Sequence, residues 1–302
     1  SKMGKVAFVF SGQGAQYPGM GKDLYSYSKA FKKVMDLADK KILDICFGGP
    51  EDILNMTINT QPCVFLTGLG CAEALKENDI HCDAVAGFSI GELAALAYAK
   101  AFSYPDAYST VLLRAHIMEK CAKENPGVMY AVIGAEVKEV MDLCEKVSNC
   151  YPVNFNCPGQ IVVSMSKDSE NDFQKLSGYN GIKTVKLNVS GAFHSPFMKK
   201  AEDALIGHMS DIKFVRPVMP VYSNLLAAPY EDDFMVLCKQ VSHPVLWEKS
   251  IRNMINDGFD TFIEAGSKKV LSNMIKRTDK YVRVFNVYDT ESLKEVVHEF
   301  RS

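Results

Sequence analysis

The sequence predicts an α/β fold in which a parallel sheet carries the functional residues and a smaller antiparallel unit is inserted into it. Three observations support this prediction. Short apolar runs typical of buried strands alternate with longer amphipathic segments typical of helices. A Gly-x-Ser-x-Gly pentapeptide lies between one such strand and the helix that follows it. Between residues 128 and 189 the order changes to strand, helix, strand, strand, helix, strand.

The first and last parts of the chain carry the alternating pattern. Before residue 126 we expect strands at 6–10 and 83–86 and helices at 31–46, 62–76, 92–97 and 106–123. After residue 190 we expect strands at 218–223, 261–264 and 282–287, helices at 196–209, 233–240, 247–257 and 270–275, and a terminal helix. Residues 3–125 and 191–302 should therefore form one core around a parallel sheet.

Residues 126–190 are expected to form a subdomain of their own. We expect strands at 128–133, 151–154, 161–165 and 183–189 and helices at 137–147 and 171–176. This β-α-β-β-α-β order is that of a ferredoxin-like unit. The α/β pattern continues on both sides of it, so we interpret the unit as an insertion into the larger core.

Composition excludes several classes of protein. Of 302 residues 47% are apolar, and 34 basic residues nearly balance 36 acidic ones, which argues against a nucleic-acid-binding or polybasic membrane surface. No apolar stretch approaches the roughly 18 residues that span a bilayer. The nine cysteines form no Cys-x-x-Cys pair and no secretory signal is visible. We expect a cytoplasmic protein in a reducing compartment, with no bound metal or cofactor.

The pentapeptide Gly87-Phe88-Ser89-Ile90-Gly91 predicts a nucleophilic serine. A sharp turn between a strand and a helix requires small residues around the serine and holds its hydroxyl clear of the backbone. The partial positive charge at the helix N-terminus favours an attacking oxygen there. The alternative is an ordinary strand-to-helix turn with a capping serine.

A nucleophilic serine needs a base, and His194 is the strongest of six histidines. It lies in the tight segment SGAFHSP, between the last strand of the insert and a new helix, where α/β folds place chemistry. Serine followed by histidine is also the chain order of α/β-hydrolases. His243 is the other loop histidine, but Pro244 and Trp247 beside it favour a packing role.

The segment SGQGAQYPG at 11–19 follows the first strand and invites comparison with phosphate-binding loops. It fits neither pattern, because a dinucleotide fingerprint needs glycine at Tyr17 and a Walker motif needs glycine at Gln16 and a hydroxyl at Asp23. A glycine-rich turn beside the elbow can instead supply backbone N–H groups to an oxyanion, together with the N–H of Ile90.

Taken together, these segments resemble the malonyl-CoA:acyl carrier protein transacylases, a family that includes the acyltransferase domains of fatty-acid and polyketide synthases. The resemblance extends from Lys5 to about Ile275. The motifs that carry it are FSGQGAQ at 10–16, GFSIGE at 87–92, Leu113-Arg114, VNFNCPGQ at 153–160, GAFHS at 191–195, QVSHPVLW at 240–247 and EAG at 264–266. The family fold is an α/β-hydrolase-like core with a ferredoxin-like insert, in agreement with the two-part prediction.

The resemblance implies roles for five residues. Ser89 would attack the thioester of malonyl-CoA and carry the acyl group as an ester, with His194 as its base. The main-chain carbonyl of Gln240 would orient His194, which makes this a dyad and not a full triad. The N–H groups of Gln13 and Ile90 would form the oxyanion hole.

The resemblance also implies residues that select the substrate. Arg114 would hold the malonyl carboxylate through two parallel hydrogen bonds, although without the resemblance a structural ion pair is the commoner role of such an arginine. Asn156 and Gln160 would line the acyl or pantetheine site. Phe88 stands where the family commonly has histidine, which affects substrate preference or rate. Phe193 is the residue type that malonyl-preferring members of the family carry at this position, whereas methylmalonyl users tend to carry a smaller one. A large ring leaves less room for an α-methyl branch.

The expected partners are malonyl-CoA and a phosphopantetheinylated acyl carrier protein, and we expect a monomer. Carrier proteins are acidic, and the candidate basic rim consists of Lys199, Lys200, Lys268, Lys269, Lys276 and Arg277. Alternatives are a trans-acting acyltransferase or acyl hydrolase of a polyketide pathway, an esterase with an acidic partner for His194, and a non-catalytic scaffold. The ferredoxin-like insert and Arg114 argue against the esterase. Intact Ser89, His194, Gln13 and Arg114 argue against the scaffold.

Overall fold

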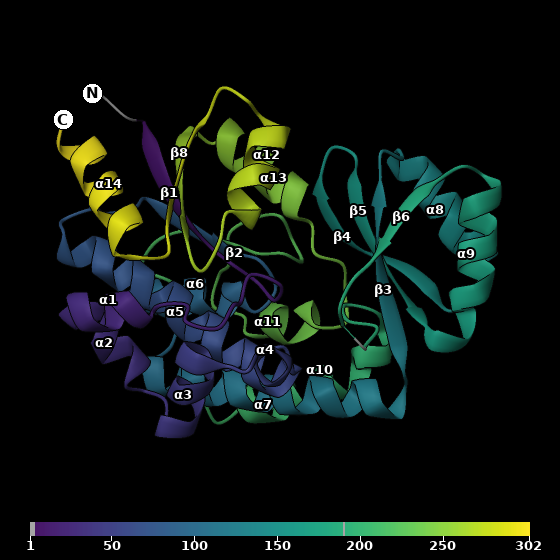
Figure 1. The fold of residues 1–302 in the computed structure, drawn as a ribbon, viewed down its shortest axis with the longest axis horizontal. Coiled ribbons are helices and arrows are strands. Elements are labelled where there is room, and N and C mark those ends of the chain that lie inside the picture. The colour runs from purple at the N-terminus through teal and green to yellow at the C-terminus, as the bar shows by residue number, and fades with distance from the viewer. Residues whose placement is uncertain (1–3, 190) are drawn as a thin grey trace.

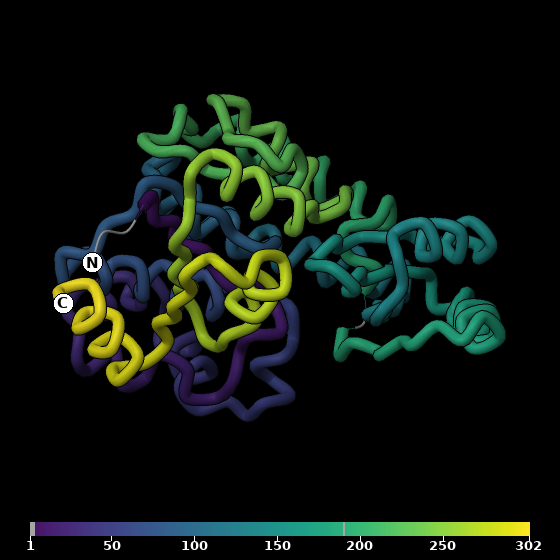
Figure 2. Tube along the Cα trace, turned by 90° about the horizontal axis from the view of Figure 1, so that it is seen from above, coloured from purple at the N-terminus to yellow at the C-terminus, as the bar shows by residue number. Residues whose placement is uncertain are grey.

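The computed structural model describes residues 4–189 and 191–302. A larger part contains a parallel sheet, and a smaller part is built around an antiparallel sheet (Figure 1). The long helix α7 (Tyr104–Glu124) leads from the first part into the second. In the view from above, the smaller part lies on the side opposite the terminal helix α14 (Thr290–Arg301) (Figure 2).

The sheet of the larger part has five strands in the order β7-β2-β1-β8-β9, all of them parallel. These strands are β1 (Lys5–Phe10), β2 (Ala84–Gly87), β7 (Val221–Tyr222), β8 (Phe259–Ala265) and β9 (Arg283–Val287). Because parallel strands end at the same edge, the loops after β1, β2 and β8 meet there. The glycine-rich loop and the serine elbow both follow strands at this edge.

Alternating side chains of β1 serve two hydrophobic cores. Phe8 and Phe10 pack on one face, which is covered by α5 (Thr57–Glu77) and α6 (Gly91–Tyr98), whereas Ala7 and Val9 pack on the other. That second face is covered by α12 (Trp247–Asn256) and α13 (Val270–Thr278). Burial on both faces explains why the strand is apolar throughout.

The smaller part has four antiparallel strands in the order β4-β5-β3-β6. Its elements are β3 (Gly127–Ile133), α8 (Val137–Lys146), β4 (Cys150–Cys157), β5 (Gln160–Ser166), η1 (Lys167–Ser169), α9 (Glu170–Tyr179) and β6 (Lys183–Lys186). A β-bridge between Pro126 and Gly191 joins the two ends of this part. The ferredoxin-like interpretation stays a prediction.

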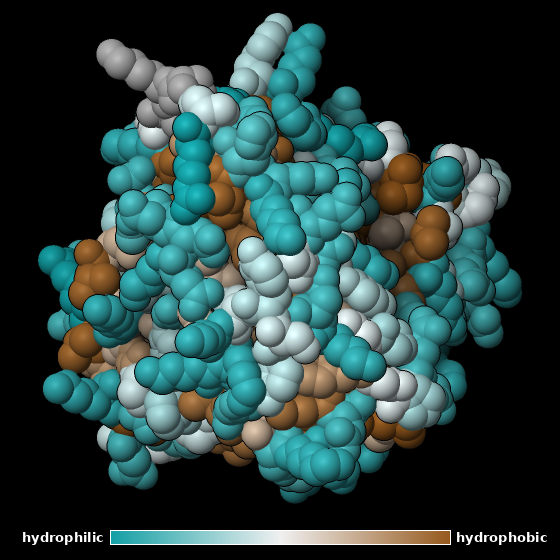
Figure 3. All heavy atoms as spheres, turned by 60° about the vertical axis from the view of Figure 1, so that its left-hand side comes forward, coloured by the Kyte–Doolittle hydropathy of each residue, from teal (hydrophilic) through white to brown (hydrophobic). Residues whose placement is uncertain are grey.

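Shorter helices complete the larger part. They are α1 (Lys22–Tyr27), α2 (Lys29–Met35), α3 (Lys40–Gly48), α4 (Glu51–Leu54), η2 (Pro196–Met198), α10 (Lys199–Met209) and α11 (Met235–Gln240). The face of the molecule in Figure 3 is mostly hydrophilic, with apolar residues in small separate patches.

Three predicted elements differ from the structure. The helix expected at 31–46 is two helices, because the Asp39 side chain accepts the N–H of Ile42 and starts α3 as a new helix. The strand expected at 183–189 ends at Lys186, and its continuation lines a cleft. The strand expected at 218–223 is only the two-residue β7, which pairs with two residues of the short strand β2.

All nine cysteines are free thiols, and only Cys82 is not fully buried. Across residues 4–189 and 191–302, no helix is long and apolar enough to cross a membrane. The same residues contain no group of three or more His, Cys, Asp or Glu side chains that could hold a metal ion.

Candidate active site

The serine elbow requires glycine at positions 87 and 91, because the turn leaves no room for a larger side chain at either position. A Cβ on Gly87 would lie 2.0 Å from the backbone of Gly91, and one on Gly91 would lie 2.2 Å from the carbonyl oxygen of Phe10. Ser89 has a φ of 52°, in the left-handed region that non-glycine residues rarely adopt. The turn therefore places Ser89 at the start of α6 in a strained conformation.

Ser89 and His194 are brought together from segments about 100 residues apart. The Oγ atom of Ser89 lies 2.7 Å from Nε2 of His194, and Nδ1 of His194 lies 2.9 Å from the carbonyl oxygen of Gln240. A carbonyl oxygen only accepts, so Nδ1 carries the hydrogen, which leaves Nε2 of the neutral ring to accept the Ser89 hydroxyl hydrogen. This is the arrangement that a serine nucleophile and its base require.

His194 is almost completely buried, with 4% of its surface exposed. Burial and then the positive charge of Arg114 lower the pKa of His194 to about 4. The ring is therefore neutral at neutral pH and free to take a proton. Its φ of 61° is also in the left-handed region, and its backbone N–H donates to the carbonyl oxygen of Val241.

Arg114 extends from α7 into the same cluster and is buried, with 1% exposed. Nη1 donates to Oε1 of Gln61 over 2.8 Å, and Nη2 donates to Oγ of Ser89 over 3.1 Å and to Oε1 of Gln240 over 2.9 Å. Its Nε has no hydrogen-bond partner among residues 4–189 and 191–302. Burial lowers the pKa of Arg114 to about 10, and the charge of Glu92 opposes that shift.

The partners of Arg114 are therefore amide and hydroxyl groups. Among the residues that the structure describes, no carboxylate lies within ion-pair distance of its guanidinium. A buried cation needs an anionic partner to offset the loss of hydration. The arrangement favours an arginine that receives a carboxylate from a ligand beside Ser89, and it gives no support to the structural ion pair.

The loop after β1 lies against the elbow. The Phe88 N–H donates to the carbonyl oxygen of Phe10, and a Cβ on Gly12 would lie 2.7 Å from the carbonyl oxygen of Phe88. This contact packs the segment that precedes Gln13 against the elbow, and the oxyanion-hole role of the Gln13 and Ile90 N–H groups stays a prediction. The Gln13 side chain is held by a 3.3 Å hydrogen bond from Nε2 to Oγ1 of Thr57.

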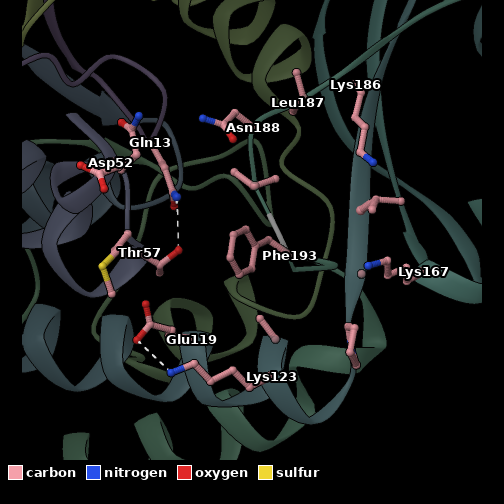
Figure 4. A pocket seen from close by; sticks show the side chains of 17 residues that line it. Gln13, Asp52, Thr57, Glu119, Lys123, Lys167, Lys186, Leu187, Asn188 and Phe193 are labelled. Carbon is pink, nitrogen blue, oxygen red and sulfur yellow. Dashed lines mark hydrogen bonds and ion pairs between the residues drawn. The ribbon is translucent and has the colours of Figure 1, made fainter.

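A cleft of about 740 Å³ opens between the two parts of the molecule. Gln13 lies on one side of it and Phe193, next to His194 in sequence, faces it from the opposite side (Figure 4). Lys123, Lys167 and Lys186 also line the cleft. Lys186 pairs with Glu170 over 2.7 Å, and Lys123 lies 3.9 Å from Glu119.

Of the predicted site residues, Gln13 and Phe193 line this cleft, whereas the cluster of Ser89, Ile90, Arg114, His194 and Gln240 and the remaining predicted residues lie outside its lining. Phe88 packs edge-on against Trp247, with 5.5 Å between the ring centroids. Asn156 is buried on β4, and its Oδ1 has no hydrogen-bond partner in the part of the chain that the structure describes. Gln160 lines a separate pocket of about 300 Å³ together with Arg277. Their roles toward the substrate stay predictions.

The predicted basic rim is not uniform. Lys199 pairs with Glu202 and Asp203, and Lys200 pairs with Glu124. Lys276 and Arg277 donate to backbone carbonyls, and Lys268 lies over the ring of Tyr17.

Sequence reasoning missed two residues of the cluster, Gln61 and Asn224. Gln61 comes from α5 and contacts Arg114, while Asn224 follows β7 and contacts the elbow. No local pattern marks either residue. Gln240 was expected to act through its carbonyl alone, but its side chain also binds Arg114 and donates to the carbonyl oxygen of Ser89 over 2.9 Å.

Comparison with known proteins agrees with this geometry. The family model described as the acyl transferase domain matches residues 7–295. The malonyl CoA-acyl carrier protein transacylase of Bacillus subtilis (strain 168) is 34% identical over 311 residues, which cover 99% of this chain and 98% of that protein.

Two solved structures extend the comparison. The malonyl CoA-acyl carrier protein transacylase from Clostridium perfringens superposes with a TM-score of 0.93 at 32% identity, covering 98% of this chain and 97% of that one. A malonyl-transacylase in complex with a type II PKS acyl-carrier protein superposes with a TM-score of 0.91 at 29% identity, covering 98% and 99%. With a family match over nearly its whole length, this chain belongs to the acyl transferase domain family.

Proposed function

We propose that this protein transfers a malonyl group from malonyl-CoA to the phosphopantetheine thiol of an acyl carrier protein, supplying extender units for fatty-acid synthesis. The observation that carries the proposal is the buried guanidinium of Arg114, 3.1 Å from the hydroxyl oxygen of Ser89 and without a carboxylate partner among the described residues. A carboxylate on the transferred acyl group supplies that partner. The names of the relatives agree with this substrate.

In the first half of the reaction, Ser89 attacks the thioester carbon of malonyl-CoA. As the Oγ–carbon bond forms, Nε2 of His194 takes the hydroxyl proton, and the carbon–sulfur bond then breaks. The same proton passes from His194 to the departing sulfur, so CoA leaves as a thiol. The carbonyl oxygen of Gln240 keeps the Nδ1 hydrogen in place throughout.

In the second half, the thiol of the carrier protein's phosphopantetheine arm gives its proton to His194 and attacks the ester carbon. The new carbon–sulfur bond forms, the Oγ–carbon bond breaks and the proton returns to Ser89. In both halves the N–H groups of Gln13 and Ile90 stabilise the negative oxygen of the tetrahedral intermediate. The chemistry requires no metal or cofactor.

Arg114 holds the malonyl carboxylate with two parallel hydrogen bonds, and Phe193 limits the space beside it. The cleft between the two parts admits the pantetheine arm, which malonyl-CoA and the acyl carrier protein both carry. We assign residues 3–125 and 191–302 to the catalytic core and 126–190 to a ferredoxin-like subdomain, of which residues 3 and 190 lie outside the part of the chain that the structure describes. We further propose that the protein is a cytoplasmic monomer, and that Asn156, Gln160 and Phe88 contact the acyl or pantetheine group.

A polyketide pathway is the second candidate, as a source either of a trans-acting acyltransferase or of an acyl hydrolase. The observation that favours it is the similarity to a malonyl-transacylase solved with a type II PKS acyl-carrier protein. The chemistry at Ser89 is the same for the transferase, whereas a hydrolase releases free acid.

Intact-protein mass spectrometry after brief exposure to malonyl-CoA tests the proposal, with acetyl-CoA and methylmalonyl-CoA alongside. We expect a malonyl adduct that Ser89→Ala abolishes and that phosphopantetheinylated carrier protein removes faster than water does. No adduct, or an adduct lost at the same rate with and without the carrier protein, would refute the transferase.

A further inference from the structure

Asn224, in the loop after β7, makes four hydrogen bonds around the elbow and is completely buried. Its Oδ1 accepts the backbone N–H of Ser89 over 2.8 Å and Nε2–H of Gln240 over 3.1 Å. Its Nδ2 donates to the carbonyl oxygen of Gly87 over 2.7 Å, and its backbone N–H donates to Oε1 of Glu92 over 2.6 Å. Every polar atom of the side chain therefore has a partner in or beside the active site.

The first consequence concerns the shape of the elbow. The carbonyl of Gly87 and the N–H of Ser89 flank the sharp turn, and the side chain of Asn224 binds both of them at once. Ser89 has a φ of 52°, a conformation that persists only where the surrounding structure enforces it. One amide group with a donor and an acceptor is suited to hold these two backbone groups at a fixed separation.

The second consequence concerns the base. Gln240 binds Asn224 through Nε2, and its carbonyl oxygen holds Nδ1 of His194 over 2.9 Å. The same Gln240 side chain accepts from Arg114. Asn224 is thus the shared partner of the segment that carries the nucleophile and the segment that orients its base.

We propose that Asn224 is a positioning residue, which fixes the Ser89 elbow and links it to Gln240 so that Oγ of Ser89 and Nε2 of His194 stay within hydrogen-bond distance. The inference rests on the proposed acyl transfer but concerns the geometry of Ser89, which any serine-directed reagent reports. Asn224 does not touch the acyl group, so its loss lowers the maximal acylation rate and leaves the apparent KM for malonyl-CoA unchanged.

Two variants test the proposal. Asn224→Ala removes all the side-chain bonds, and we expect single-turnover malonylation to slow on the order of 100-fold, the scale of a displacement of about 1 Å at a reacting centre. Asn224→Asp keeps the acceptor for Ser89 but replaces the donor to Gly87. A protonated carboxyl group restores that donor, so this variant should regain rate as the pH falls from 8 to 6.

The groups around position 224 act in opposite directions: the carboxyl group of Glu92 favours this protonation, whereas the guanidinium of Arg114 opposes it. Glu92 accepts from the backbone of Asn224, Tyr230 donates to Glu92 over 2.6 Å, and Arg114 lies beyond Gln240. Burial raises the pKa of Glu92 to about 7, and a second carboxyl group beside it resists ionisation. Recovery is therefore read as the ratio of the variant rate to the wild-type rate, because Glu92 titrates in both proteins whereas His194, with a pKa of about 4, stays neutral in both.

Asn253→Ala is the matched control. Nδ2 of Asn253 donates to the carbonyl oxygen of Ala227 over 2.9 Å, close to the same loop but without contact to the elbow. We expect it to remove this contact of the loop while acylating Ser89 at the wild-type rate.

Labelling of Ser89 by a fluorophosphonate ester provides a readout that needs no acyl donor or carrier protein. Both Asn224 variants should be labelled on the order of 100-fold more slowly at pH 8. Folded Asn224 variants with wild-type labelling and malonylation, or an Asn224→Asp rate without recovery at pH 6, would overturn the positioning role. Failure of wild-type malonylation with normal labelling would instead overturn the proposed function and leave the positioning test intact.

Discussion

The guanidinium of Arg114 donates a hydrogen bond to the hydroxyl oxygen of Ser89, so the group that we propose selects the substrate touches the group that we propose attacks it. A hydrogen bond to a charged group contributes about 1.5–3 kcal/mol, which corresponds to roughly 10- to 100-fold in rate. Arg114→Ala should lower kcat/KM for malonyl-CoA by at least that factor and affect acetyl-CoA much less. Arg114→Lys should not restore the wild-type ratio, because an ammonium group lacks the planar fork.

Mass-spectrometric rates of Ser89 acylation with the two thioesters measure this ratio directly. Equal losses for malonyl-CoA and acetyl-CoA would mean that Arg114 supports the serine and does not recognise the acyl carboxylate.

The pH dependence of acylation should reflect the depressed pKa of His194. The ring accepts a proton only when neutral, and it is neutral above its pKa of about 4. The rate should therefore be lost as the pH falls through about 4, and not near 6.5 as for an ordinary histidine. A profile of kcat/KM for malonyl-CoA reports this value, with each sample returned to pH 7 to exclude inactivation. An acid limb near 6.5 would contradict the assignment.

Phe193 should control the tolerance of an α-methyl branch, because its ring faces the cleft beside His194. Phe193→Leu provides space, and we expect the preference for malonyl-CoA over methylmalonyl-CoA to fall about tenfold, within the range that one methyl group produces. Competition between the two thioesters, read as the ratio of Ser89 adducts, measures it. An unchanged ratio in a variant with wild-type Tm would exclude Phe193 from this role.

Lys167 is exposed on the rim of the cleft, and the described residues provide no ion-pair partner for it. Lys167→Glu should raise KM for malonyl-CoA several-fold, because a rim charge steers an anionic ligand. A phosphate-free malonyl thioester of N-acetylcysteamine should be unaffected. Lys183→Glu is the control, since Lys183 is exposed on the same subdomain, on β6, but does not line the cleft. Equal effects of both variants would indicate general repulsion.

Two glycines allow a stability comparison. Gly87→Ala places a Cβ 2.0 Å from the backbone of Gly91, and we expect a loss of at least about 2 kcal/mol and of Ser89 labelling. Gly207 lies exposed in α10, and a Cβ added to it would have no neighbouring atom within 4 Å. Gly207→Ala should therefore raise Tm, because alanine in a helix interior is favoured over glycine by up to about 1 kcal/mol. Thermal unfolding of both variants checks the prediction, and a Gly87→Ala protein as stable as wild type would contradict the steric account.

Local patterns were sufficient for some features of this protein and not for others. The strand before Ser89 and the helix after it could be predicted because the elbow needs glycine at fixed positions. His194 could be predicted as a candidate base from its position in a loop. The two-part division followed from the change in element order. The break between α2 and α3 was not predicted, because it depends on one capping side chain, Asp39.

The residues that complete the site depend on long-range contacts. Asn224 meets Ser89 only because β7 pairs with β2, and that strand has just two residues. Gln61 meets Arg114 because two long helices pack together. The sequence around Asn224 or Gln61 does not predict these contacts, since an asparagine after a short strand or a glutamine in a helix has no distinctive pattern.

The position of β1 at the centre of its sheet has a consequence for biosynthesis. Its edges pair with β2 and with β8, and the second pairing joins Lys5 to Phe259. While the chain is being made, one edge of this apolar strand has no partner until nearly all of the residues have emerged. Such non-local pairing slows folding and leaves unpaired backbone N–H and C=O groups of β1 free to pair with other chains. The nascent protein should therefore depend on chaperones, and the elbow should acquire its nucleophilic shape only late in synthesis.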